Sequence, residues 1–168
     1  MGALEQMLRD VAWGDIDVMV VDMPPGTGDT QLTMSQRVPL AGAVIVSTPQ
    51  EMALADVRRG LAMFEKTRAP VLGVVENMAY FETPDGKRTH IFGEGGARRV
   101  AAEVGAPFLG EIPMNPQLRI NADAGRLEEN FSAESVSRAA LEHVAEQTAI
   151  RVVEELLSGP ALPTLEVL

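Results

Sequence analysis

An acidic residue follows the first apolar run of the chain and opens a glycine-rich turn. Residues 16–21 read IDVMVV, and Asp22 follows as the first residue of the string DMPPGTGD. A carboxylate at the tip of a buried strand is the Walker B arrangement, in which it holds Mg²⁺ directly or through water. Gly26 and Thr27 lie in the turn, where glycine lets backbone N–H groups approach an anion. A strand-capping aspartate before an ordinary Pro/Gly turn is the alternative interpretation.

Two later apolar runs end in residues that suit recognition of a base. Asn77 follows the run VLGVV, and an asparagine amide presents a donor and an acceptor side by side, as the edge of adenine requires. Pro113 follows the run PFLGEI, where a proline loop could flank the base. A turn-forming asparagine is the alternative at position 77. Ligands of open α/β sheets bind beyond the carboxyl ends of the strands, so we expect these residues to share one edge with Asp22.

The elements that must position these residues alternate along the chain. The predicted strands are Ile16–Val21, Ala43–Ser47, Val71–Val75 and Pro107–Ile112. Their nearly continuous aliphatic runs are typical of parallel strands covered on both faces. Helices are predicted at 29–38, after a capping box at 48–51, at 95–104, and from Ser132 to about Leu157. The pattern predicts an α/β, doubly wound, mostly parallel sheet.

The domain organisation is simple. Residues 1–158 form one predicted domain, and residues 159–168, which follow the closing Gly-Pro pair, form a loose tail. The stretch 78–93 is the one irregular insertion, and it is long enough for a functional loop or a small hairpin.

The composition excludes several functional classes. The 168 residues include no cysteine, so this chain offers no disulfide and no Cys-ligated metal or iron–sulfur site. A formal net charge of −10 opposes general affinity for nucleic acid backbones. No apolar run approaches the roughly 18 residues of a membrane helix, and the N-terminus lacks a signal-peptide pattern. We therefore expect a cytoplasmic protein that binds neither nucleic acid nor membrane.

The order of motifs along the chain is more specific than any one of them. The chain resembles the Mrp (ApbC-like) family of nucleotide-binding iron–sulfur carriers, within the MinD/ParA clan of P-loop ATPases. The resemblance covers roughly residues 2–124. The motifs that carry it are DMPPGTGD (22–29), VSTPQEMALADVRRG (46–60), VVENMAYF (74–81), IFGEGGARR (91–99) and PFLGEIP (107–113).

The resemblance implies a role for each matching position. Asp22 would organise Mg²⁺ through its water shell, and Gly26, beside Thr27, would lie near the γ-phosphate of ATP. Asn77 would read the adenine, with Pro113 and its neighbours beside the ring. The family dimerises around nucleotide, couples cluster transfer to a slow ATPase, and has iron–sulfur client or scaffold proteins as partners.

One departure from the family concerns the phosphates. The deviant Walker A loop GKGGVGKS and the switch I aspartate are absent, and the chain's two lysines, Lys66 and Lys87, lie outside any glycine-rich loop. That lysine and its loop supply much of the affinity for the β- and γ-phosphates. We expect weak ATP binding and little or no hydrolysis by this chain alone.

A second departure concerns the cluster. The family's CPxC pair should fall within 78–93, but Thr83 stands where the first cysteine belongs and the second is missing. Threonine does not ligate iron–sulfur clusters. His90 and His143 have no partner at metal-ligand spacing, and the pairs Arg58-Arg59 and Arg98-Arg99 are expected to be solvated or to form ion pairs.

Together these features predict an Mrp-type carrier in truncated form that begins at an internal methionine. In the family the missing P-loop strand lies beside the strand predicted at 16–21, so its loss would expose a strand edge and favour oligomerisation or poor solubility. A cysteine-free MinD/ParA-like binding module without cluster chemistry is the alternative. A Rossmann dehydrogenase is disfavoured, because residues 26–31 lack the third glycine of its motif.

Overall fold

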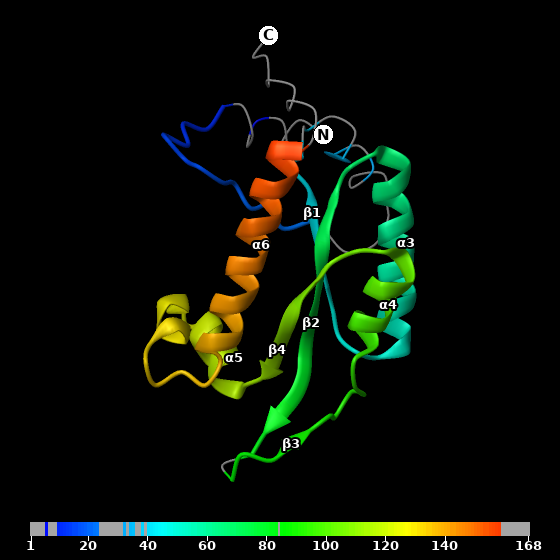
Figure 1. Cartoon of the computed structure of the whole chain (residues 1–168). Coiled ribbons are helices and arrows are strands. Elements are labelled where there is room, and N and C mark those ends of the chain that lie inside the picture. Colours follow the sequence, from blue (N-terminus) through cyan, green and yellow to red (C-terminus); the bar gives the residue numbers. More distant parts are fainter. Residues whose placement is uncertain are drawn as a thin grey trace.

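The computed structural model describes residues 6, 10–23, 32, 34–35, 38, 40–83 and 85–158. Within them, a four-stranded mixed sheet lies between helices on its two faces (Figure 1). In chain order the elements are β1 (Ala43–Ser47), α3 (Glu51–Thr67), β2 (Val71–Glu82), β3 (Arg88–Thr89), α4 (Gly96–Val104), β4 (Phe108–Met114), α5 (Pro116–Asp123), the 3-10 helix η1 (Leu127–Phe131) and α6 (Arg138–Ser158). The predicted α/β class with a mostly parallel sheet is confirmed.

The central strand β2 organises the sheet. β1 pairs with it in parallel along its first half, so that Ser47 lies opposite Glu76. β4 also pairs in parallel, and Asn77 lies opposite Ile112. β3 pairs antiparallel with the far end of β2, which makes the predicted insertion a hairpin that projects from the sheet. The three parallel strands all run toward the lower end in Figure 1, where β1 ends opposite Glu76, midway along β2, and β4 ends opposite Phe81.

The two faces of the sheet are covered unequally. α3 and α4 pack on one face and enclose the core cluster, whereas α6 lies on the other face and has no buried residue. The core cluster consists of Leu54, Val57, Leu61, Val74, Ala97, Val100 and Ala101. α6 approaches β4 closely at Gly110, where an added Cβ would lie 2.9 Å from Val144 Cγ2. Glycine is therefore needed at this contact between helix and strand.

Several predicted helix boundaries are wrong. The capping box before α3 does not form, because the Thr48 hydroxyl donates to Gln50 Oε1 at 2.9 Å and Gln50 is the N-cap. The last helix begins at Arg138 instead of Ser132, because η1 and a turn occupy the preceding residues. The sequence analysis missed α5. The helix predicted at 29–38 and the tail at 159–168 fall largely or wholly outside the described residues.

The strand predicted at 16–21 is absent. These residues are irregular, and none of the described strands pairs with them. Val18 and Val20 are 63% and 89% exposed. An apolar segment becomes a strand only when a neighbour takes up its backbone hydrogen bonds, and the described part of the sheet offers this segment no such neighbour.

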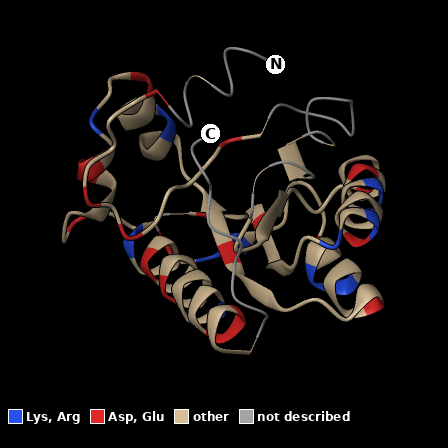
Figure 2. Cartoon of the chain, turned by 90° about the horizontal axis from the view of Figure 1, so that it is seen from above, with Lys and Arg blue, Asp and Glu red and all other residues tan. Residues whose placement is uncertain are grey.

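Charged residues on the helices form mixed pairs. In Figure 2, acidic and basic residues alternate along α3 and α4, the two helices on the right. Arg58 bonds Glu103 at 3.0 Å between these helices, and Arg98 bonds Glu111 of β4 at 3.1 Å. The ion pairs expected for the arginine doublets are thus confirmed. In the described part of the chain, no helix is both long enough and apolar enough to cross a membrane.

Candidate functional site

A buried carboxylate lies midway along β2, opposite the end of β1. Glu76 is 1% exposed and is the one charged residue among the buried residues of the described chain. Its Oε1 accepts a hydrogen bond from the Gly95 N–H at 3.1 Å, and its Oε2 accepts one from the Ala97 N–H at 2.7 Å. Gly95 is the N-cap of α4 and Ala97 lies in its first turn, where unpaired N–H groups and the helix dipole favour a negative charge. Glu76 therefore caps a helix that has no cap from its own residues.

Asn77 lies next to this anchor, at a bend in β2. Its side chain is partly buried, and its Oδ1 accepts a hydrogen bond from the Met78 N–H at 2.9 Å. Met78 has φ 55°, in the left-handed region that non-glycine residues seldom adopt. The register between β2 and β4 also shifts between Asn77 and Phe81. A strained backbone and a shifted register at the same place change the direction of the strand. Such features are typical of functional sites.

The end of β4 lies beside Asn77 and is held by amide side chains. Pro113 is buried within the strand, so the expectation that it lies in a loop is wrong. β4 has β2 as its one described partner, and proline is tolerated on such an edge because it needs no donor there. Asn115 then caps α5, as its Oδ1 accepts from the Gln117 N–H at 2.9 Å, and its Nδ2 donates to Ser137 Oγ at 3.0 Å.

Asp22 lies outside the described strands. It is exposed and belongs to the irregular segment 10–23. Figure 1 draws that segment in blue, beginning at the upper end of the molecule and running toward β1. Gly26 and Thr27 fall outside the described residues. The role assigned to Asp22, Gly26 and Thr27 remains a prediction.

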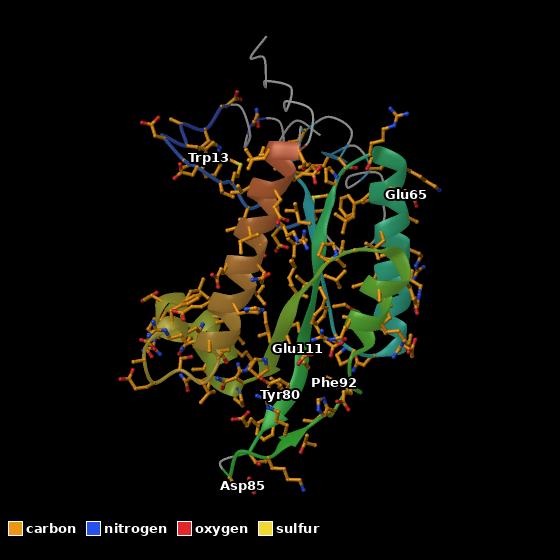
Figure 3. The ribbon with its side chains drawn as sticks, in the orientation of Figure 1. Trp13, Glu65, Tyr80, Asp85, Phe92 and Glu111 are labelled. Carbon is orange, nitrogen blue, oxygen red and sulfur yellow. The ribbon has the colours of Figure 1, made fainter. Side chains whose placement is uncertain are left out.

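The hairpin beyond Asn77 is held by ring and charge contacts. The Arg88 guanidinium lies 4.1 Å from the ring centre of Tyr80 and bonds Glu82 at 3.1 Å. His90 Nδ1 lies 3.1 Å from the Ala79 carbonyl oxygen. Figure 3 places Asp85 at the far end of the projecting hairpin, with Tyr80 nearer the sheet.

The hairpin tip offers oxygen atoms and no thiolate. Thr83 Oγ1 donates to the Asp85 carboxylate, and this hydrogen bond, helped by backbone hydrogen bonds, lowers the pKa of Asp85 below its ordinary value. In the segments that the structure describes, no three His, Cys, Asp or Glu residues gather into a possible metal site.

The sequence analysis missed the role of Glu76 and the polar contacts behind Asn115. Gln117 Nε2 donates to Asn121 Oδ1 at 2.7 Å, and Asn121 Nδ2 donates to the Asn130 amide oxygen at 2.9 Å. One available signal was the glycine-rich start of α4, GEGGA, which has no Ser, Thr, Asp or Asn to cap it. Such a start requires an acceptor from elsewhere in the fold.

The chain matches one family model over most of its length. A ParA-family model described as "NUBPL iron-transfer P-loop NTPase" matches residues 1–149. Among curated proteins, the iron-sulfur cluster transfer protein NUBPL of Dictyostelium discoideum is 57% identical over 125 residues, which are 74% of this chain and 39% of that protein. The iron-sulfur cluster carrier protein of Deinococcus radiodurans is 48% identical over 159 residues, which are 92% of this chain and 45% of that protein.

A solved structure agrees with these matches. A nucleotide-binding protein from Archaeoglobus fulgidus in complex with ADP is 49% identical and superposes with a TM-score of 0.69. The match covers 76% of this chain and 53% of that one. The chain thus spans about half the length, or less, of the relatives described here.

Proposed function

The chain belongs to the ParA-type NUBPL/Mrp family of iron–sulfur cluster carrier P-loop NTPases, and from that premise we propose that it recognises the adenine of a nucleotide within a protein of iron–sulfur cluster transfer. The iron–sulfur cluster is then cargo of the assembled carrier. The residues proposed to contact adenine, Asn77 and Pro113, are the part of the carrier that this chain supplies. Partner clients or scaffolds, dimerisation around nucleotide and a cytoplasmic location belong to the same proposal.

One observation carries the proposal. Asn77 lies midway along β2, just beyond the end of β1 and opposite Ile112, the residue before Pro113, so both predicted base contacts lie on adjacent strands. No described residue accepts a hydrogen bond from Asn77 Nδ2, and its Oδ1 retains a second lone pair. An amide with this capacity matches the donor and acceptor pair on adenine.

Magnesium and the phosphates are supported by sequence alone. An exposed aspartate carboxylate is a hard oxygen donor that suits the water shell of Mg²⁺, so Asp22 fits the ion chemically. Mg²⁺ would neutralise charge on the β- and γ-phosphates when bound.

The cluster does not fit this chain's own side chains. Iron–sulfur clusters are held by cysteine thiolates, with histidine as an occasional substitute, and the sequence has no cysteine. The alternative function, a MinD/ParA-like binding module without cluster chemistry, is favoured by this one observation. Affinity capture would separate them: cluster-assembly proteins support the carrier role, and membrane or DNA-segregation factors support the alternative.

Nucleotide titration tests the proposed function. NMR titration of the full ¹⁵N-labelled chain should give tighter binding of ADP than of GDP. Asn77→Ala should reduce that preference roughly tenfold, the effect of about 1.4 kcal/mol of lost base discrimination. Gln147→Ala on α6, away from this edge, is the matched control and should change nothing. Equal ADP and GDP affinities in the unmodified chain would overturn the proposal.

A further inference from the structure

Glu76 is a buried acidic residue that forms no ion pair with any residue in the described part of the chain. The nearby arginines of α4 are engaged elsewhere, since Arg98 pairs with Glu111 and Arg99 with Glu51. The two oxygens of Glu76 instead accept backbone N–H bonds from Gly95 and Ala97. Hydrogen bonds to an ionised acceptor are stronger than neutral ones, and the N-terminus of a helix adds positive potential. Both features offset the cost of burying this carboxylate.

The carboxylate joins three segments that are distant in sequence. Glu76 belongs to β2, its donors belong to the start of α4, and Gly96 between those donors packs against the turn after β1. A Cβ on Gly96 would lie 2.5 Å from the Pro49 carbonyl oxygen. The end of β1, the middle of β2 and the start of α4 are thus fixed to one another next to Asn77.

Glu76 also sets the orientation of β2 just before its bend. Successive side chains of a strand point to opposite faces, so fixing Glu76 on the α4 face turns Asn77 toward the other face. The next residue, Met78, has a strained backbone, and the β4 register shifts directly after Asn77. A strained conformation persists only where its surroundings hold it, and the Glu76 anchor is the contact immediately before it.

We propose that Glu76 is a positioning residue for nucleotide recognition: by anchoring the middle of β2 to the start of α4, it holds Asn77 in the orientation that reads the base. This inference rests on the proposed adenine recognition. It has a structural corollary, because Glu76 occupies the N–H groups of Gly95 and Ala97 and leaves those two groups unavailable to a phosphate.

The test compares Glu76→Gln with Glu103→Gln in the full ¹⁵N-labelled chain. Glu76→Gln keeps the size of the side chain but places an amide NH₂ against a backbone N–H. Glu103→Gln is the control, because Glu103 is an exposed partner of Arg58. We expect amide exchange at Gly95 and Ala97 to accelerate roughly tenfold in Glu76→Gln, with a displaced Asn77 side-chain NH₂ resonance. The ratio of GDP to ADP dissociation constants should fall toward one. A role limited to stability would weaken both nucleotides equally and leave the ratio unchanged.

Each outcome decides a separate point. An unchanged Asn77 NH₂ resonance and an unchanged nucleotide ratio in Glu76→Gln would overturn the positioning role. If the unmodified chain does not distinguish ADP from GDP, the proposed function fails, and the Asn77 resonance alone decides whether Glu76 holds Asn77. If Glu76→Gln does not fold, Glu76→Asp replaces it, because aspartate keeps the charge on a shorter side chain. We expect a smaller shift of the Asn77 NH₂ resonance in Glu76→Asp, and no shift would overturn the inference.

Discussion

At Gly96 two pieces of the backbone lie too close together for any side chain. An added Cβ would lie 2.5 Å from the Pro49 carbonyl oxygen and 2.8 Å from Leu54 Cδ1, whereas nothing lies within 4 Å of one added at Gly60 in α3. We expect Gly96→Ala to lower the free energy of unfolding by about 1–3 kcal/mol through overpacking. Gly60→Ala should raise it by about 0.5–1 kcal/mol, because alanine favours a helix interior. Urea unfolding followed by circular dichroism measures both, and two changes of the same sign would contradict this contact geometry.

The pKa of Asp85 depends on one neighbouring hydroxyl. The hydrogen bond from Thr83 is the largest cause of its lowered pKa, so Thr83→Val should raise the pKa of Asp85 toward its ordinary value. Because the folded-state pKa lies below the unfolded one, the hydrogen bond stabilises the fold above the unfolded pKa. That stabilisation is lost as the pH falls through the folded value. An NMR titration of the Asp85 carboxyl carbon measures the shift, and Thr89→Val in the same hairpin should leave it unmoved.

Strands were predictable where burial and pairing coincide. The apolar runs at 43–47, 71–75 and 107–112 form β1, the first part of β2 and most of β4. The run at 16–21 carries the same signal but forms no strand, because an apolar run encodes the capacity to be buried and does not provide a partner. The length of a strand is limited in the same way, because no local sequence pattern predicts that β2 continues through Met78, with its left-handed backbone, to Glu82.

The candidate site was predictable only in part, for a related reason. Asn77 and Pro113 were predicted just beyond strand ends, which is wrong for both, because β2 continues to Glu82 and β4 to Met114. The register nevertheless puts Asn77 opposite the residue before Pro113. The contact between Glu76 and the start of α4 spans 19 and 21 residues of sequence, so it depends on how the crossover folds back. Local patterns cannot specify such a bond, although the uncapped GEGGA start of α4 signals that an acceptor is needed.

The outer edge of β1 is open to pairing with another chain. β1 pairs with β2 on one side, no described strand pairs with its other side, and Val46 in it is 59% exposed. Open strand edges favour pairing with another chain, and a lysine on the edge suppresses it. We expect the chain to self-associate in analytical ultracentrifugation and Val46→Lys to reduce this association.

Val136→Lys is the matched control for that experiment. Val136 is 75% exposed but lies in the turn before α6, away from any strand edge, so its substitution should leave the association unchanged. A monomer with sharp two-state unfolding would contradict a role for the open β1 edge.

The groups needed for phosphate transfer are not assembled in the described chain. Asp22 is exposed and lies in the irregular segment 10–23, outside the described strands. The N–H groups of Gly95 and Ala97 are occupied by Glu76. The sequence also has no glycine-rich loop with a lysine. The proposed recognition of a base and the hydrolysis of a phosphate are therefore separable in this chain, because the sequence lacks the glycine-rich loop with a lysine that hydrolysis needs.

This separation predicts a chain that binds adenine nucleotides weakly without turning them over. Phosphoryl transfer depends on positioning and on neutralising charge with a lysine-bearing loop and Mg²⁺, so release of phosphate from ATP should stay below ~0.01 per second with or without Mg²⁺. A malachite-green assay measures the rate, and Asp22→Asn should leave it unchanged, because a carboxylate without the phosphate loop stabilises no transition state. A rate above this limit that requires Mg²⁺ and is lost in Asp22→Asn would contradict this prediction. It would mean that Asp22 lies close to the bound phosphates.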